Sequence, residues 1–374
     1  MTDALRIKHS PDEALRALLA FLLESGRVSA VLSLERIGRE SDPVQSLITD
    51  PEALDSATPL LPMMPSNAGK LLAEITELNP TPEPIAAVLR PCELRALVEL
   101  RKLNRAHLEN TLLISFTCGG VFPLSTRGGN GIDARTAQWR DALSRGENAD
   151  GIRPTCRACE HFVPSGADLT VALVGESAGN GTCTILIDSE RGAEALEGFE
   201  GERTEVEPES EALRALQARR AQGADDLFSD PDTADLGLDG LIRIFGRCLS
   251  CRACSTVCPI CYCDLCYFDS STAESNPTRI EAQLRHRRAV RIPTDTVRFH
   301  IGRMMHMAIS CVGCGMCSDV CPVSIPVATL FSMVGRSAGD VFSYVPGRDL
   351  TEALPLTRFE AEELTHIGEE RSER

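Results

Sequence analysis

Two copies of one cysteine pattern occupy the second half of this chain of 374 residues. Each copy reads C-x2-C-x2-C-x3-C-P, so three thiolates lie close together and the fourth follows beyond a turn. In proteins with two 4Fe-4S clusters, the first three thiolates of such a run bind one cluster and the fourth binds the other. The runs are Cys248, Cys251, Cys254 and Cys258 before Pro259, and Cys311, Cys314, Cys317 and Cys321 before Pro322.

This spacing predicts two 4Fe-4S clusters. Gly313 and Gly315 lie inside the second run, where glycine lets the backbone pass close to a cluster. Zinc explains the pattern less well, because zinc sites usually combine two hooks of two ligands each. Disulfides explain it less well too, because they belong mainly to small secreted proteins. We expect one cluster on Cys248, Cys251, Cys254 and Cys321, and the other on Cys311, Cys314, Cys317 and Cys258.

Three further cysteines follow the first run within a few residues: Cys261, Cys263 and Cys266. Two clusters do not need them, and three explanations remain. They bind a fourth cluster, with Cys183 or a partner protein supplying the missing ligand, or they replace Cys258 as the ligand of the second cluster. Otherwise they are packed thiols, which are common in protein interiors.

The composition indicates a protein that carries cofactors inside a soluble fold. Its 16 cysteines are too many for an ordinary cytoplasmic protein and need a cofactor to explain them. The net charge of -16 argues against nucleic acid as a partner, because phosphate binding needs a concentrated basic face. No apolar run approaches the length of a membrane span, and the first residues do not resemble an export signal. We therefore expect a soluble, cytoplasmic protein.

Helices and strands are expected to alternate in the first half of the chain. Apolar residues at helical spacing predict helices, and short apolar or alternating runs predict strands. Such alternation is typical of an α/β layer with a mostly parallel sheet. The expected helices cover residues 12–25, 68–78 and 93–104, and the expected strands cover residues 28–34, 85–89, 111–117 and 169–174.

Four more cysteines are placed where this sheet would meet a ligand. Cys92 and Cys118 follow directly after expected strands, at the edge where open α/β sheets bind their ligands. Cys156 and Cys159 form a C-x2-C pair farther along the chain. The fold would be able to bring the four thiols to one point, although ordinary buried thiols are the simpler alternative.

Three segments around these cysteines resemble a known family. They are Arg90–Arg95, Phe116–Gly120 and Cys156–Cys159, and Ala167-Asp168 and Val174–Glu176 follow them in the same order. Together they look like the beta subunit of deazaflavin-coenzyme-reducing hydrogenases and, with the two cysteine runs attached, like the beta subunit of cytoplasmic formate dehydrogenases. The resemblance covers residues 10 to 345. It implies a third 4Fe-4S cluster on Cys92, Cys118, Cys156 and Cys159, and an FAD site in the sheet domain.

The residues themselves do not decide whether FAD binds. Ser66 and Asn67 resemble a family loop that meets FAD, at a helix N-terminus suited to a pyrophosphate, although a plain helix cap explains them equally well. A second wall of the site would come from the glycines Gly175, Gly179 and Gly181. Against this, the family's glycine pair at the first helix is replaced by Pro11–Glu13, whose two carboxylates should repel a pyrophosphate.

The sequence divides into four expected regions. Residues 1–190 form the α/β domain, 191–240 an acidic helical linker, 241–345 a two-cluster ferredoxin domain with a helical insertion, and 346–374 a charged tail. The insertion contains a strongly basic stretch, residues 279–303. It is either a solvated helix face, a docking surface for an acidic partner, or a field that raises the potential of nearby clusters. The methionines that follow are expected to pack around a cluster.

Three functions agree with these features. The first is an electron-transfer subunit of a cytoplasmic formate dehydrogenase or hydrogenase, working between a catalytic subunit and a small redox carrier or a heterodisulfide-reductase-like module. The second is a flavin oxidoreductase that reduces a deazaflavin, ferredoxin or nicotinamide. The third is a redox-sensing scaffold. No nucleophile with its base is apparent, so the chain is catalytic only if FAD is bound.

Overall fold

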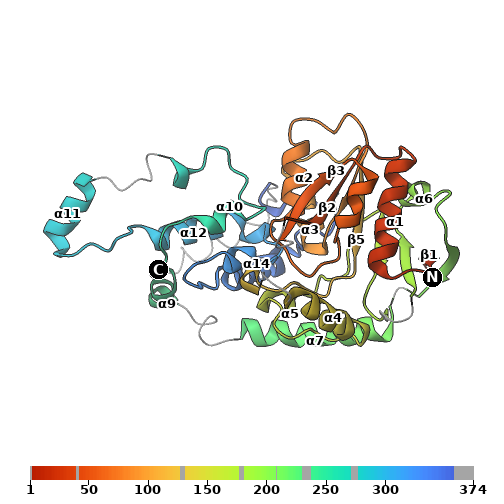
Figure 1. Cartoon of the computed structure of the whole chain (residues 1–374). Helices are drawn as coiled ribbons and strands as arrows, with labels where there is room; N and C mark the ends of the chain where they lie inside the picture. The colour runs from red at the N-terminus through yellow and green to blue at the C-terminus, as the bar shows by residue number, and fades with distance from the viewer. Residues whose placement is uncertain are drawn as a thin grey trace, which may run out of the picture.

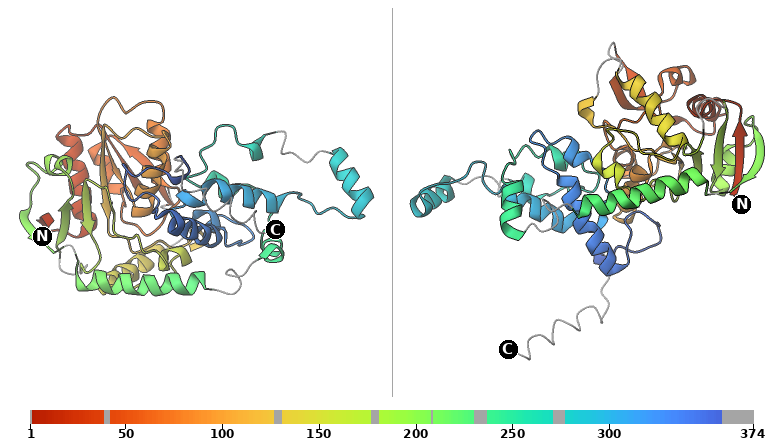
Figure 2. Two further views of the ribbon diagram at one scale, coloured as in Figure 1. Left: turned by 180° about the vertical axis from the view of Figure 1, so that it is seen from behind. Right: turned by 90° about the horizontal axis from the view of Figure 1, so that it is seen from below.

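The computed structural model describes residues 2–38, 42–126, 131–176, 181–207, 209–229, 237–270 and 277–357. These residues form an α/β unit around one sheet and a smaller helical unit that contains both cysteine runs (Figure 1). Helix α11 (Pro277–Arg287) projects away from both units in every view (Figure 1 and Figure 2). Among the described residues, no helix is long and apolar enough to cross a lipid bilayer.

The sheet is mixed rather than mostly parallel. Its eight strands lie in the order β3-β2-β4-β5-β6-β7-β1-β8. The strands β2, β4, β5 and β6 are parallel to one another, whereas the remaining neighbours pair antiparallel. The prediction of a mostly parallel sheet is therefore not confirmed. The strands are β1 (Thr2–Ile7), β2 (Ala30–Ile37), β3 (Asp42–Ile48), β4 (Ile85–Val88), β5 (Thr111–Phe116), β6 (Leu169–Ala172), β7 (Cys183–Ile187) and β8 (Glu202–Val206).

The parallel part of the sheet coincides with the alternation seen in the sequence. Helix α3 (Pro91–Lys102) connects β4 to β5 as a crossover, which keeps these neighbouring strands parallel. The antiparallel part contains the strands that the sequence analysis did not anticipate, β1, β3, β7 and β8. Of these, β1 at the N-terminus inserts between β7 and β8, a long-range pairing that no local pattern indicates.

Helices cover both faces of the sheet. Leu18 of α1 (Pro11–Glu24) packs in one core with Val31 of β2. Leu72 of α2 (Ala68–Thr76) packs in a second core with the next strand residue, Leu32. Successive side chains of a strand point to opposite faces, which explains this division. The other helical elements of the unit are η1 (Pro51–Ser56), η2 (Leu124–Thr126), α4 (Gly131–Ser144), α5 (Pro154–Arg157), α6 (Glu190–Ala195) and α7 (Glu211–Phe228).

The expected helices begin and end close to where the structure has them. Helix α1 starts with a capping box in which the Ser10 side chain accepts from the backbone of Glu13, and Glu13 bonds back to Ser10. It ends before Gly26, which has a φ of 67° and takes the left-handed conformation that glycine tolerates best. Helix α2 begins after Asn67, whose side chain accepts a hydrogen bond from the backbone of Lys70.

The helical unit packs around its cysteines. Phe245, Met307 and Phe331 share a core with seven buried or half-buried cysteines of the two runs, and Ala96 of α3 also belongs to that core. Helix α3 therefore contacts both units. The helical elements of this unit are α9 (Gly237–Phe245), α10 (Ala253–Thr256), η3 (Tyr267–Asp269), α11, α12 (Thr296–Met307), η5 (Ala308–Ser310), α13 (Met316–Asp319), α14 (Val327–Phe342) and η6 (Pro355–Thr357).

The stretch expected to be a linker contains ordered parts of the α/β unit. Within residues 191–240, strand β8 pairs with β1 at the edge of the sheet. Helix α7 packs along the unit (Figure 2), with Leu216 and Arg220 buried. Gly223 of α7 approaches so closely that an added Cβ would lie 2.5 Å from the carbonyl oxygen of Arg157. The four domain boundaries stay predictions, and most of the expected tail, residues 358–374, lies outside the described residues.

Candidate iron-sulfur sites

The two cysteine runs have the same local backbone, although their sequences differ. Gly313 and Gly315 have φ values of 69° and 83°. At the matching positions of the first run, Ser250 and Arg252 have φ values of 60° and 59°. These left-handed residues turn the backbone N–H groups toward sulfur, as Ser250 shows by donating to Cys248 Sγ at 3.3 Å. Glycine suits such positions, and the non-glycine residues hold them under strain.

Four cysteines from the two runs meet at one place, which we call the first ferredoxin group. They line one small cavity together with His300 of α12 and Ile325. Three come from the first run, and the fourth comes from the end of the second run, as the sequence pattern indicates. The first ferredoxin group consists of Cys248, Cys251, Cys254 and Cys321.

The second ferredoxin group lies deeper in the protein. Cys317 is close enough to Cys311 and Cys314 for their charges to interact. Cys258 in turn interacts with Cys317, and its sulfur lies 3.7 Å from Met307 Sδ. The group thus combines three cysteines of the second run with the last cysteine of the first. Its grouping agrees with the expected ligand set, which remains a prediction.

A third set of cysteines, the N-terminal group, comes from separate parts of the α/β unit. Cys92 lies in the first turn of α3, Cys118 follows β5, and Cys156 lies on α5. The charges of Cys92, Cys118 and Cys156 interact with one another, and Cys159 interacts with Cys156. Gly120 allows this approach, because a Cβ there would lie 2.9 Å from the Cys156 Cβ. The fold therefore brings together the four thiols named by the family resemblance.

Burial makes these thiols poor anions on their own. It raises the pKa of Cys118, Cys254 and Cys314 to about 11, and the pKa of Cys317 well above its usual value. A buried thiolate needs a positive partner, and coordinated iron supplies one. No set of three or more His, Cys, Asp or Glu side chains in the described residues is placed to hold a single metal ion. Four thiols around a larger cluster stand farther apart than ligands of one ion.

The three groups follow one another through the protein. Cys92 of the N-terminal group interacts with Cys314 of the second ferredoxin group. Cys317 of that group interacts with Cys254 of the first ferredoxin group. Apolar side chains lie between the N-terminal group and the second ferredoxin group, namely those of Met64, Val121 and Met316. The order is therefore the N-terminal group, the second ferredoxin group and the first ferredoxin group.

Buried arginines join the α/β unit to the helical unit, close to the N-terminal group and the second ferredoxin group. Arg153 donates to Asp319 at 2.5 Å and to the carbonyl oxygen of Cys314 at 3.2 Å, and both partners of the ion pair are almost fully buried. Arg95 donates to the carbonyl oxygens of Pro346 at 2.8 Å and Val312 at 3.4 Å. The charge of Arg95 interacts with Cys92 and Cys159 on one side and with Cys311 on the other.

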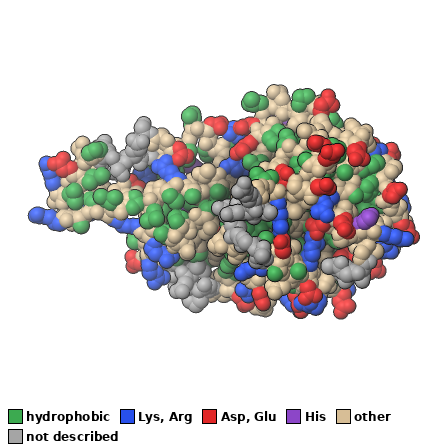
Figure 3. All heavy atoms as spheres, viewed as in Figure 1, with side chains coloured by type: hydrophobic (Ala, Val, Ile, Leu, Met, Phe, Trp, Pro, Cys, Tyr) green, Lys and Arg blue, Asp and Glu red, His purple; other side chains and the backbone are tan. Residues whose placement is uncertain are grey.

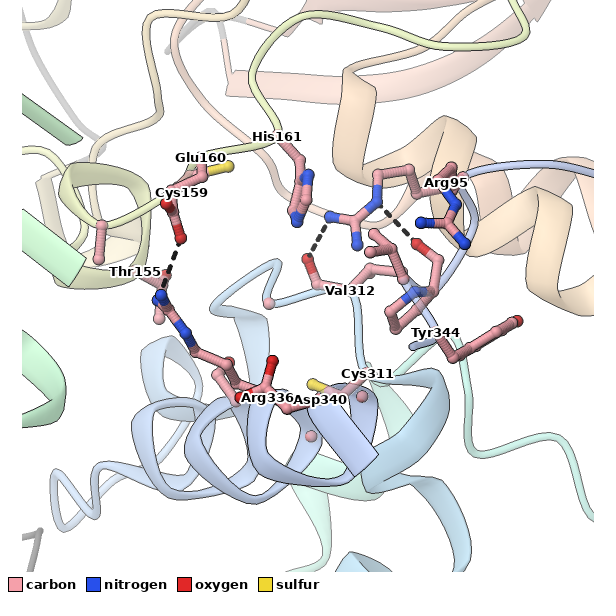
Figure 4. Close-up of a pocket in the computed structure, with 18 of the residues that line it drawn as sticks. Arg95, Thr155, Cys159, Glu160, His161, Cys311, Val312, Arg336, Asp340 and Tyr344 are labelled. Carbon is pink, nitrogen blue, oxygen red and sulfur yellow. Dashed lines mark hydrogen bonds and ion pairs between the residues drawn. The ribbon is translucent and has the colours of Figure 1, made fainter. Parts of the chain in front are cut away.

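Arg95 also lines a cavity of about 520 Å³ between the units. Figure 4 shows Cys159 and His161 on one wall of this cavity and Cys311 on another, with the Arg95 guanidinium directed across it. The cavity thus opens between the N-terminal group and the second ferredoxin group. Arg336 on its rim pairs with Glu160 at 3.0 Å.

Arg303 occupies the corresponding place between the two ferredoxin groups. Its Nη1 donates to Cys254 Sγ at 3.2 Å, and its Nε donates to Cys261 Sγ at 3.4 Å. Burial alone would lower the pKa of Arg303, but the neighbouring thiolates, Cys261 first, raise it overall. Of the three alternatives for the basic stretch, a solvated helix face does not hold for Arg303, because only 4% of it is exposed, whereas its contacts with sulfur agree with a charge that acts on nearby clusters. No spacing rule marks it as a sulfur contact.

The comparisons with known proteins agree with this arrangement. A family model for the C-terminal region of the coenzyme F420 hydrogenase/dehydrogenase beta subunit matches residues 83–212, and a model for a 4Fe-4S dicluster domain matches residues 244–325. The chain is 27% identical over 371 residues to the F420-dependent formate dehydrogenase subunit beta of Methanocaldococcus jannaschii, covering 90% of this chain and 92% of that protein.

This chain is similar, over residues 83–212, to the coenzyme F420 hydrogenase/dehydrogenase beta-subunit family. A second relative, the F420-dependent formate dehydrogenase 1 subunit beta of Methanococcus maripaludis, is 27% identical over 376 residues, covering 91% of this chain and 92% of that protein. A solved chain of the F420-reducing (NiFe) hydrogenase complex of Methanosarcina barkeri aligns at 16% identity with a TM-score of 0.45, over 64% of this chain and 94% of that one.

Both family matches contain candidate cluster ligands of this chain. Residues 83–212 include all four cysteines of the N-terminal group, and residues 244–325 include both ferredoxin groups. The second match also covers α12 and therefore Arg303. The comparisons thus support clusters in this chain, whereas the number of clusters remains to be measured.

The additional cysteines do not form one set with Cys183. Cys183 lies on β7 in the core of the α/β unit, whereas Cys261 packs in the core of the helical unit. Cys183 is therefore not the missing ligand of a fourth cluster. Cys261 is hydrogen-bonded to Cys258, which lowers the pKa of Cys261 to about 6. Exchange between these two as ligands stays open, as does a partner's ligand beside Cys263 and Cys266.

The residues named for flavin lie in two different places. Asn67 caps α2 next to α3, where the backbone N–H of Ala68 already donates to buried Glu93 at 3.1 Å. A Cβ at Gly175 would lie 3.2 Å from Ser210 Oγ, beside the start of α7. No hydrogen bond of the described residues joins these two places. Ser66 is half-buried and Gly181 has open space around it, while Gly179 lies outside the described residues.

The start of α1 offers no anion site either. Asp12 accepts from Arg140 of α4, and Glu13 closes the capping box with Ser10. Both carboxylates therefore serve contacts within the chain, and hydrogen bonds from Ser10 hold the pKa of Glu13 below its usual value. The described residues do not fit a flavin site at this position, and we derive no chemistry from FAD.

Proposed function

We propose that this chain is an iron-sulfur electron-transfer subunit of a multi-subunit redox complex such as a formate dehydrogenase or a hydrogenase. One observation carries the proposal: three groups of cysteines lie in succession across both units, because Cys92 and Cys314 pack in one cluster and Cys317 and Cys254 share another core. Clusters of the 4Fe-4S type, when bound there, supply the capacity to accept and release single electrons.

The protein's own residues prepare these places. Apolar side chains pack against cysteines of both the N-terminal group and the second ferredoxin group. Backbone N–H groups and Arg303 donate to cysteine sulfurs, which stabilises negative charge there. Arg153 and Arg95 fix the two units against each other, so that the distance between the groups is set by buried contacts rather than by a linker. This rigidity favours a relay over a sensor that must change shape.

The proposed partners follow from the relatives. Both named relatives are beta subunits of formate dehydrogenases, so we propose a catalytic subunit of a formate dehydrogenase or hydrogenase as one partner. A small redox carrier or a heterodisulfide-reductase-like module is proposed as the other. FAD stays a prediction, and a flavin enzyme is not carried forward as a second candidate, because no contact of the described residues at the start of α1 favours it.

The test is the metal content and magnetic state of protein purified without oxygen. We expect iron and acid-labile sulfide in equal amounts, at about 12 of each per chain if three 4Fe-4S clusters are present. After reduction, EPR spectra should show clusters that interact with one another. Cys183→Ala is the matched control, because this buried cysteine belongs to none of the three groups and should leave the iron content unchanged. Bound zinc, or less than about 8 irons per chain, would contradict the proposal.

A further inference from the structure

A projecting arm, residues 277–295, stands apart from the rest of the molecule. It consists of α11 and the segment that leads from α11 to α12 (Figure 1). Among the described elements, α11 has no extensive packing against another helix or strand, and most of its side chains are exposed. A helix of 11 residues is marginal in water without packing. Helix α11 therefore has little packing against other described elements, which is the kind of contact that normally stabilises such a helix.

The arm and the helix α12 that follows it are basic, in contrast to the rest of the chain. Residues 277–306 contain seven arginines and two acidic residues, although the whole chain has a net charge of -16. Figure 3 shows Lys and Arg side chains at the projecting end, with hydrophobic side chains between them. Five of the arginines are exposed to solvent: Arg285, Arg287, Arg288, Arg291 and Arg298. The surface thus presents positive charge that the chain's own net charge does not explain.

An apolar groove of about 800 Å³ lies at the base of the arm, between α9, η3 and α12. Leu238, Ile242 and Met305 of this groove are 67%, 46% and 75% exposed. Arg287, Arg291 and Arg298 line its rim. An apolar centre with a charged rim is the usual arrangement of a protein-protein interface.

The groove adjoins the first ferredoxin group. The charge of Arg291 interacts with Cys248 of that group. Cys251 is exposed, whereas Cys118 and Cys317 of the other two groups are buried. The neighbouring Leu249 is 57% exposed. The arm is therefore placed beside the part of the relay that comes closest to solvent.

We propose that the arm and groove dock a small electron-transfer protein with an acidic surface. This inference rests on the proposed function, since it names the partner at one end of the relay. Charge complementarity selects the partner: arginines around an apolar centre attract carboxylates around an apolar contact, and they speed association at low salt. One electron then passes between the first ferredoxin group's cluster and the partner's one-electron centre; one is oxidised, the other reduced, and no bond or proton is exchanged.

Binding of an acidic plant-type ferredoxin to the full chain, purified anaerobically with its clusters, tests the proposal by calorimetry at low and high salt. The triple variant Arg285→Glu, Arg287→Glu and Arg288→Glu should weaken binding by about 10-fold or more at low salt and remove most of the salt dependence. The control triple variant Arg6→Glu, Arg203→Glu and Arg214→Glu has the same charge change on exposed positions of the α/β unit, and should stay within about twofold.

A second variant tests the apolar groove. Met305→Asp places a charge on an exposed wall and should weaken binding without changing iron content. Equal losses in both triple variants, or no loss in the arm variant, would overturn the proposal. So would arm-dependent binding to vesicles of phosphatidylglycerol and phosphatidylcholine, or arm-dependent self-association in sedimentation, without ferredoxin binding. Missing clusters would instead count against the proposed function, because iron content is measured separately from binding.

Discussion

The ferredoxin groups and the N-terminal group assemble the same kind of ligand by different routes. Each ferredoxin run places its cysteines within a single turn-rich stretch, so local backbone conformation decides most of the geometry. The N-terminal group takes Cys92, Cys118 and Cys156 from three separate segments of the α/β unit. Its geometry depends on the sheet, on α3 and on the close approach at Gly120. The first kind of site is specified locally, and the second exists only in the folded unit.

The arginines buried between neighbouring groups also differ in their partners. Between the N-terminal group and the second ferredoxin group, Arg153 has a carboxylate partner, Asp319. Between the two ferredoxin groups, Arg303 meets sulfur atoms and carbonyl oxygen instead. Arg153 therefore serves as a clamp between units, whereas the charge of Arg303 acts on the cysteines themselves.

The largest expected effects are losses of whole clusters. Cys314→Ala should remove one ferredoxin cluster, and Cys156→Ser should remove the N-terminal cluster, each with a loss of about 4 irons per chain. Iron analysis and EPR of the two variants check this. The Cys156→Ser spectrum should keep both ferredoxin signals, because its site is assembled independently of the runs. Unchanged iron in either variant would refute the ligand assignment of that group.

Breaking the clamp should cost the most stability. Arg153→Met leaves Asp319 buried without its cation, at a cost of about 3–5 kcal/mol in the free energy of unfolding. Denaturant unfolding of the full chain measures this. The control on the same interface is Arg336→Met, whose ion pair with Glu160 is largely exposed and should contribute less than about 1 kcal/mol. Similar losses in the two variants would show that Arg153 is not a clamp.

Arg303 should act on reduction potential more than on stability of the fold. Arg303→Met removes a positive charge and two hydrogen bonds to sulfur, so the ferredoxin clusters should become harder to reduce. A charged hydrogen bond contributes about 1.5–3 kcal/mol, which corresponds to a lowering of roughly 60–120 mV for one electron. EPR-monitored redox titration measures the shift. Arg303→Lys, which keeps the charge, should recover part of it, and equal potentials in all three proteins would exclude this role.

The smallest expected effects compare the two runs at their left-handed residues. Gly315→Ala should destabilise the protein more than Gly313→Ala, although both incur about 1–2 kcal/mol of backbone strain. The added Cβ at Gly315 would lie 2.4 Å from Thr155 Oγ1, whereas at Gly313 the nearest atom, Ser332 Oγ, is 3.5 Å away. Conversely, Ser250→Gly should stabilise the first run by less than about 1 kcal/mol. Thermal unfolding of the three variants measures these differences. A larger loss of stability in Gly313→Ala than in Gly315→Ala would contradict the prediction.

Sequence analysis reached the ferredoxin groups because their ligands are a few residues apart. It also found α1, α2 and α3 and the parallel strands, because hydrophobic periodicity is local. It missed β1 and β8, whose pairing joins residues almost two hundred positions apart. It left the role of Arg303 among three alternatives, because a basic side chain on a polar helix gives no local sign that sulfur atoms face it.

The sequence by itself predicted which thiols of the two runs belong together, since the spacing of Cys248 to Cys258 and of Cys311 to Cys321 constrains how the chain can wrap around a cluster. Tertiary structure alone decided that the sheet is mixed and that Cys183 stays apart from the other thiols. It also decided that the three groups follow one another in a row. These features depend on contacts between segments far apart in the chain, and the free energy of such contacts is not written in any short pattern.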